Sequence, residues 1–355
     1  MSDVNGVDGN YFLWIDVIRY ILRKGATMAT IKDVAKKAGV SVATVSRVLN
    51  DESIVAPQTV KRVKDAIREL NYMPNMLGNH LRKSATNNIL VLIPTASNQF
   101  YNRILRGIQS EAHRFGYNTM VCMTNADKEI EEKYLTLLKT KLADGAVFLS
   151  STLSSTAINQ LGNSYPIVQC CEKIDGSNTS CVTIDNEQAG YEATCALIKK
   201  GHRKIAFLGS SQGFVSSRER HHGYCRALEQ YHIPYREEYV LLDTFSYNSG
   251  IRLAEAILQL KERPTAIFAI ADTIAIGAMR FLLSHSLRVP EDIAVIGFDN
   301  ISVSSVYTPS LSTVAQPQLE LGQNAVGLLL DKMKNINCAN RNILLPHNLL
   351  LRETV

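Results

Sequence analysis

The sequence predicts a small all-α head near the N-terminus followed by a larger α/β body built on parallel sheets. Two observations lead to this fold class. Residues 30–50 contain two short amphipathic helical patterns around a tight turn, and strand-like and helix-like segments alternate from residue 88 onward. The chain has 355 residues, of which 46% are hydrophobic, so it can bury a large core in two or three domains.

The segment TIKDVAKKAGVSVATVSRVLN, residues 30–50, has the form of a helix-turn-helix. Apolar residues recur at helical spacing over residues 31–38, and Gly39 can supply the positive φ that ends this first helix. Ser41 is a suitable N-cap for a second helix over residues 42–50. The side chains expected to face inward at the turn and from the second helix are Val40, Val45, Val48 and Leu49.

The outer face of the second helix suits contact with nucleic acid. Its small side chains allow close approach to base edges, while its hydroxyl, guanidinium and amide groups can bind phosphates and bases. These outward residues are Val42, Ala43, Thr44, Ser46, Arg47 and Asn50. We therefore expect the helix to enter the major groove of double-stranded DNA. Any two amphipathic helices around a glycine would share AxxxGV, but the full run through SxxTVSR favours the DNA-binding interpretation.

The charge distribution agrees with a DNA-binding head. The whole chain has a formal net charge of +5. Between residues 28 and 87, ten Lys and Arg residues face five Asp and Glu residues, so the excess lies in this segment and the rest sums to zero. A basic head on a neutral body predicts a nucleic-acid footprint at one end. Solvated helix faces also carry charge runs, so charge alone would be only suggestive.

This head resembles the DNA-binding head of lactose-repressor-type transcription factors. The resemblance is carried by residues 30–50, by NYMP at residues 71–74 and by Leu81, and it extends over everything after Thr27. It implies a homodimer that binds a pseudo-palindromic double-stranded DNA operator and is switched by a small-molecule effector. Further DNA contacts implied by the resemblance are Thr30, Ser41, Thr59, Leu81 and Arg82.

The N-terminal third of the chain divides into an extension, a head and a linker. Residues 1–27 are expected to be a non-native or disordered extension; a partner-binding or membrane-surface helix is the alternative. The head spans residues 28–74, including a third amphipathic helix over Val60–Leu70. Residues 75–87 are expected to be a hinge helix that DNA orders, because Gly78 replaces the family's usual Ala and weakens the helix. A flexible linker is the alternative interpretation.

Residues 88–355 are expected to form the effector-binding and dimerisation domain. Repeated strand–helix units form parallel sheets covered by helices on both faces. Two such sets make two subdomains that resemble type I periplasmic sugar-binding proteins. We expect an N-subdomain of residues 88–184 and 314–345, and a C-subdomain of residues 185–313 and 346–355.

The effector site is expected in the cleft between the subdomains, because ligands of open parallel sheets bind beyond the carboxyl ends of the strands. Aromatic side chains there can stack on sugar or base faces, while Arg and Asp can hydrogen-bond ring substituents. With the family's positions as a guide, the expected effector contacts are Phe100, Tyr101, Cys171, Glu172, Arg220, Phe245, Asp272 and Asp299. Ordinary core packing is the alternative for the aromatics, and a turn or helix-cap role for Asp299.

At two positions the residue differs from the one common in the family, and this leaves the class of effector open between a sugar and a nucleoside. Cys171 stands where several relatives have Asp, and Ala271 stands where Asn is common. We expect a sugar-type effector. Ala271, Gly78 and the run at residues 313–333 resemble the cytidine-repressor branch, so a nucleoside- or purine-responsive regulator remains the alternative. A solute-binding protein is a distant alternative, because the N-terminus does not read as a secretory signal and a basic head is attached.

The sequence argues against an enzyme. It has no P-loop, GxSxG or HExxH motif and no paired carboxylates at useful spacing, so we expect no catalytic residues, metal or cofactor. Seven cysteines without CxxC spacing indicate reduced thiols and a cytoplasmic location. No apolar stretch approaches the roughly 20 residues of a membrane span. The operator, the regulated genes, any phosphoprotein co-regulator and the sign of the effector response stay open.

Overall fold

The structure is a computed structural model that describes residues 29–50, 52–72 and 85–355. The described residues separate into two compact units, one within residues 1–84 and the other over residues 85–355. The predicted N-terminal extension and most of the predicted hinge, including Leu81 and Arg82, lie outside the described residues.

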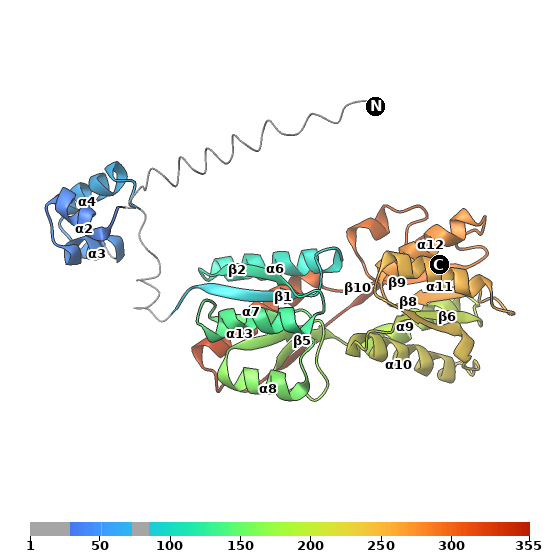
Figure 1. The fold of residues 1–355 in the computed structure, drawn as a ribbon. Coiled ribbons are helices and arrows are strands. Elements are labelled where there is room, and N and C mark those ends of the chain that lie inside the picture. Colours follow the sequence, from blue (N-terminus) through green and yellow to red (C-terminus); the bar gives the residue numbers. More distant parts are fainter. Residues whose placement is uncertain (1–28, 51, 73–84) are drawn as a thin grey trace, which may run out of the picture. The chain divides into compact units, whose positions relative to one another are not determined.

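The first unit is a small bundle of helices (Figure 1, blue). Its elements are α2 (Ile31–Ala38), α3 (Val42–Asn50), the short 3₁₀ helix η1 (Glu52–Ile54) and α4 (Pro57–Glu69). The helices enclose one apolar core, in which Val34, Val45 and Val63 are fully buried, one from each α-helix. Each helix therefore presents a single apolar stripe to the other two, as the helical spacing predicts.

The turn between α2 and α3 confirms the predicted helix-turn-helix. Gly39 has φ of +62° and ends α2, and its surroundings are open, so backbone conformation alone explains a glycine here. The Oγ of Ser41 accepts the N–H of Thr44 at 3.1 Å and so caps α3. The third helix begins at Pro57, three residues before the expected start at Val60, because the fixed φ of proline suits the first helical position.

The second unit contains two six-stranded sheets. The first, ordered β11-β5-β4-β3-β1-β2, is parallel throughout. Its strands are β1 (Asn88–Ile93), β2 (Asn118–Met123), β3 (Gly145–Phe148), β4 (Ile167–Cys170), β5 (Ser180–Ile184) and β11 (Asn342–Leu345). The second is ordered β12-β10-β9-β8-β6-β7, and only its β10–β12 pair is antiparallel. Its strands are β6 (Ile205–Ser210), β7 (Val240–Asp243), β8 (Ala266–Ala269), β9 (Ala294–Asp299), β10 (Ser312–Ala315) and β12 (Asn348–Leu350).

Helices cover both sheets, which is why the central strands are apolar along their whole length. Those connected with the first sheet are α6 (Phe100–Arg114), α7 (Lys128–Lys139), α8 (Ser155–Ser164) and α13 (Gln318–Lys334). Those connected with the second are α9 (Asn186–Lys199), α10 (Val215–Gln230), α11 (Tyr247–Leu258) and α12 (Asp272–Ser284), together with the 3₁₀ helices η2 (Glu237–Tyr239) and η3 (Ser302–Ser305). No helix among the described residues is long and apolar enough to cross a membrane.

The chain passes between the two sheets after β5, after β10 and between β11 and β12. The segment CVTIDN, residues 181–186, supplies most of β5 to the first sheet before the crossing begins. The expected return to the N-subdomain at residue 314 is too early. Residues 313–315 still pair with β9 and β12 in the second sheet, so the return begins after Ala315.

Candidate functional site

The outward face of α3 carries the side chains expected to contact DNA. Val42, Ala43 and Arg47 are exposed, whereas Val45 and Val48 on the opposite face are buried in the core of the head. Val42 and Ala43 are small and Arg47 is a long cation, which suits close approach to a groove and a hydrogen bond to a base or phosphate.

Two other expected DNA contacts already cap helices. The Oγ1 of Thr30 accepts the N–H of Asp33 at 3.4 Å and Oδ2 of Asp33 accepts the N–H of Thr30 at 2.8 Å, which forms a capping box at the start of α2. The Oγ of Ser41 lies 2.9 Å from Oγ1 of Thr44. The half-buried members of the expected set are Thr44, Ser46 and Thr59. The side chain of Asn50 is not described by the structure.

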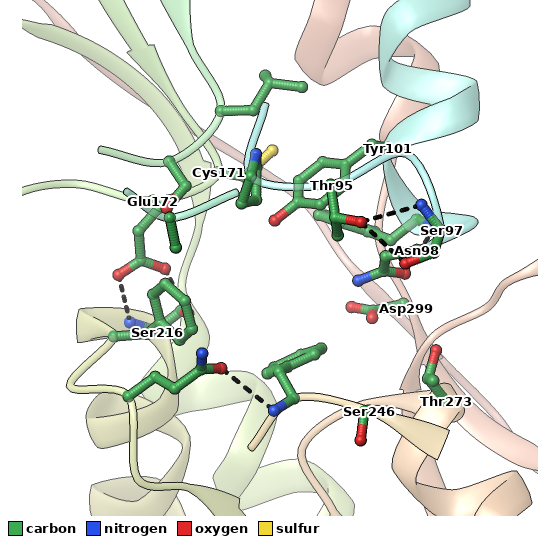
Figure 2. A pocket seen from close by; sticks show the side chains of 18 of the residues that line it. Thr95, Ser97, Asn98, Tyr101, Cys171, Glu172, Ser216, Ser246, Thr273 and Asp299 are labelled. Atoms are coloured by element: carbon green, nitrogen blue, oxygen red, sulfur yellow. Dashed lines mark hydrogen bonds between the residues drawn. The ribbon is translucent and has the colours of Figure 1, made fainter. Parts of the chain in front are cut away.

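A cavity of about 490 Å³ lies in the second unit, lined by residues that follow strands of both sheets (Figure 2). Polar and aromatic side chains converge on it from the ends of β1, β3, β4, β6, β7 and β9. This is where ligands of parallel sheets bind. Seven of the eight residues expected at the effector site line it: Phe100, Tyr101, Cys171, Glu172, Arg220, Phe245 and Asp299.

Asp272 does not belong to this set, which corrects the prediction. It is fully buried, and its carboxylate accepts hydrogen bonds from Oγ of Ser304 (2.6 Å), Oγ1 of Thr313 (2.6 Å) and N–H of Ile301 (2.9 Å). Burial raises its pKa to about 6, against the effect of these donors. Asp272 thus fastens the start of α12 to β10 and the preceding loop, and its neighbour Thr273 lines the cavity instead.

Arg220 is a buried cation held in one orientation. Its Nε donates to Oδ1 of Asn186 at 3.0 Å, its Nη1 donates to the carbonyl of Ile270 at 2.6 Å, and its guanidinium lies 3.6 Å from the centre of the Phe298 ring. Helix α9 can approach this closely because Gly190 has no side chain; a Cβ there would lie 2.4 Å from the Arg220 carbonyl oxygen. Burial lowers the pKa of Arg220, but an arginine remains charged in a protein.

Asp299 is the buried carboxyl of the cavity. Its Oδ1 accepts from Nε2 of Gln316 at 2.7 Å. Burial raises the pKa of Asp299 to about 8; Arg220 and Gln316 act in the opposite direction, and Asp272 adds to the rise. Burial therefore favours the protonated form of Asp299, which can donate as well as accept. This versatility suits a polyhydroxylated ligand.

The aromatic side of the cavity includes a residue that the sequence reading missed. The rings of Phe214 and Phe245 meet edge to face, with centroids 6.2 Å apart. Tyr101 lies across the cavity near Cys171 (Figure 2), and burial raises the pKa of its hydroxyl. Phe214 stands directly before α10, after the end of β6. The rule that ligand contacts follow strand ends would have found it.

Other lining residues also lacked a motif to single them out. These polar residues are Thr95, Ser97, Asn98, Asn125, Ser150, Gln212, Ser216, Ser246 and Thr273. The described residues contain no group of three or more His, Cys, Asp or Glu side chains arranged to hold a metal ion.

Two family models match this chain. Residues 30–75 match the bacterial regulatory proteins of the lacI family, and residues 86–353 match the periplasmic binding proteins and sugar-binding domain of the LacI family. The chain belongs to the LacI family. It is a DNA-binding transcriptional regulator, and LacI-family regulators bind DNA operators and small-molecule effectors.

Individual LacI-family proteins match over nearly their whole length. The transcriptional regulator RegA of Clostridium saccharobutylicum is 37% identical over 332 residues, covering 92% of this chain and 99% of RegA. The lac repressor dimer bound to operator and the anti-inducer ONPF has a TM-score of 0.82 at 29% identity, covering 92% of this chain and 98% of that one. A complex of the regulator CelR with cellobiose has a TM-score of 0.71 at 29% identity, covering 92% and 100%.

Proposed function

We propose that this regulator is a homodimeric repressor that binds a pseudo-palindromic operator and is switched by a small sugar-type effector. The observation that carries the proposal is the cavity at the strand ends, where Arg220 and Asp299 stand near an aromatic wall of Phe214 and Phe245. Hydroxyl groups can bond to the two polar side chains, while a ring face packs on the aromatics. The volume of about 490 Å³ suits a small molecule.

A sugar is favoured over a nucleoside by the polar lining. Hydroxyl and amide side chains surround the cavity on several sides, which matches a ligand with hydroxyl groups around a ring. The similar CelR structure holds cellobiose. A nucleoside or purine remains the second candidate, because the edge-to-face pair of Phe214 and Phe245 could also pack against a base.

The proposed dimer interface lies along the edge strands β2 and β7, which occupy equivalent ends of their two sheets. Their exposed apolar side chains include Val121 (49% exposed), Met123 (48%) and Leu242 (53%). Tyr247, at the start of α11 after β7, adds a further exposed ring. Exposed edge strands with apolar side chains favour association with a second copy. A dimer would present two recognition helices roughly 34–36 Å apart, one turn of DNA.

The proposed switch is a change in the relative position of the two subdomains. An effector that contacts both would favour one arrangement and thereby alter the spacing of the hinges at residues 75–87. Its effect on operator affinity must equal the effect of operator on its own affinity.

A combined experiment tests these parts separately. The full chain is screened by thermal shift against sugars, sugar phosphates, nucleosides and bases, and each hit is added to a fluorescence-anisotropy titration with the DNA upstream of the gene. We expect a sugar to raise the melting temperature and change DNA affinity; a nucleoside that does both supports the second candidate. No specific DNA binding would contradict the operator proposal. Sedimentation of a monomer alone would contradict the dimer.

A further inference from the structure

Glu172 occupies the place at which an anionic ligand would bind in the cavity. Its Oε1 accepts N–H groups of Val215 (2.5 Å) and Ser216 (3.2 Å), and its Oε2 accepts the hydroxyl of Ser216 at 2.6 Å (Figure 2). Val215 is the first residue of α10. A helix N-terminus attracts anions because its first N–H groups lack partners within the helix and its dipole is positive there. The carboxylate of Glu172 already accepts the N–H groups of Val215 and Ser216 and supplies a negative charge at this helix end.

Glu172 also joins the two halves of the body. It follows β4 in the first sheet, whereas α10 follows β6 in the second. Asp175 in the same loop pairs with Arg218 of α10. Burial raises the pKa of Glu172, while the hydrogen bonds from Ser216 and Val215 and the charge of Arg220 favour its ionised form. The Glu172 carboxyl group therefore connects a loop of the first sheet with a helix of the second sheet at the wall of the cavity.

Two other helices that begin at the cavity also have a side-chain oxygen at their first N–H groups. At the start of α6, the N–H of Phe100 donates to Oδ1 of Asn98 at 3.0 Å. At the start of α11, the N–H of Ser249 donates to Oγ of Ser246 at 3.1 Å. Helix α12 has no side-chain cap, but its first residue is Asp272, which places a negative charge in the first turn.

The described lining of the cavity holds more carboxyl groups than cations. Among the described residues that line it, Arg220 is the only cation, and two of its nitrogens are engaged by Asn186 and Ile270. It faces the carboxyl groups of Asp299 and Glu172. A phosphate or carboxylate on the effector would add a like charge to this partly buried site, with no further cation to compensate it.

We infer that the effector is uncharged and unphosphorylated, and that Glu172 sets this specificity. The inference rests on the proposed function, since it concerns the effector of the same cavity. Neutral hydroxyl groups can donate to Glu172 and Asp299 and accept from Arg220, whereas an anion is repelled by the carboxylate at the start of α10. Sugar phosphates, sugar acids and nucleotides are therefore excluded as effectors.

The first test compares neutral molecules with their own phosphates by thermal shift on the full chain. The pairs are glucose and glucose 6-phosphate, ribose and ribose 5-phosphate, and cytidine and cytidine 5′-phosphate. For any pair that binds, we expect the phosphate to bind about tenfold or more weakly. A phosphate that binds as tightly as its parent overturns the inference. Anisotropy with upstream DNA, measured without ligand, reports separately on the proposed regulatory function.

The second test does not depend on knowing the effector. Glu172→Gln keeps an oxygen that can accept from the start of α10 but removes the charge, so inorganic phosphate at fixed ionic strength should stabilise this variant more than the wild type. The matched control is Glu187→Gln, in the first turn of α9 and outside the cavity lining, where Glu187 pairs with Arg226 at 2.7 Å. Equal responses of Glu172→Gln and the wild type to phosphate overturn the inference, including when no neutral ligand binds.

Discussion

The side chain of Gln316 donates from Nε2 to Oδ1 of Asp299 at 2.7 Å. Asp299 lines the cavity, whereas Gln316 lies between β10 and α13, where the chain passes from the second sheet back to the first. Gln318, the first residue of α13, adds a bond from its Nε2 to the carbonyl of Asp299 at 2.6 Å. A ligand that contacts Asp299 therefore touches a group bonded to a segment between the two sheets.

Replacing Gln316 with leucine should weaken the link between effector and operator more than effector binding itself. Leu fills a similar space but cannot donate to Asp299, so the crossing segment loses its bond to the cavity wall. We expect effector affinity to fall by less than about tenfold and the coupling free energy to fall by about 1 kcal/mol. The measurement is operator affinity by anisotropy with and without saturating effector. Gln230→Leu, at an exposed bond to Tyr191, is the control; unchanged coupling in Gln316→Leu would contradict the expectation.

The raised pKa of Asp299 should make the body less stable as pH rises. Its pKa is about 8 in the fold and 3.8 ordinarily, so between these values the folded state retains a proton that the unfolded state has lost. Stability due to this proton is fully present below pH 3.8 and is lost as pH rises through 8, by at most about 1.4 kcal/mol per pH unit. Asp272, with a pKa of about 6, also makes the folded state less stable as pH rises, but over a lower pH range.

Urea unfolding of the wild type and Asp299→Asn between pH 6.5 and 9 checks this expectation. Asparagine cannot ionise, so the variant should lose part of the decline between pH 6.5 and 8, while both proteins should respond alike above that range. Parallel curves over the whole interval would mean that Asp299 is already ionised at neutral pH.

Replacing Phe245 with alanine should weaken the effector response and spare DNA binding. Phe245 is half-buried beside Phe214 at the cavity, so the loss removes ligand-packing surface with a small effect on the core. We expect about tenfold weaker effector binding, corresponding to roughly 1.4 kcal/mol. Effector titration by thermal shift provides the measurement, and Phe115→Ala, at the exposed end of α6, is the control. A normal effector response would remove the packing role.

Replacing Arg47 with alanine should reduce operator affinity without unfolding the head. The side chain is exposed on the outward face of α3, and a base contact there would contribute about 1–3 kcal/mol. Anisotropy titrations and the melting curve together separate recognition from folding. The control is Arg68→Ala on α4, because Arg68 already pairs with Asp65 at 2.7 Å. Equal losses in both variants would indicate a general charge effect instead.

Much of the fold could be predicted from the sequence because it depends on interactions between residues that are close together in the chain. Gly39 and Ser41 define the turn of the head because a positive φ and a side-chain cap act within a few residues. The alternation of apolar strands and helices is also visible over short stretches of sequence, and it predicts parallel sheets. The rule that ligands bind beyond the ends of parallel strands then predicted where the cavity lies.

The sequence by itself determined the recognition helix, the two-sheet body and seven of the residues around the cavity, since these depend on spacing along the chain. Only the tertiary structure decided which way neighbouring side chains point. Asp272 turns to Ser304 and Thr313, some 30 to 40 residues away, and leaves Thr273 at the cavity. Glu172 caps a helix that starts 43 residues later. A buried carboxylate requires donors, and the fold alone determines which distant donors are within reach.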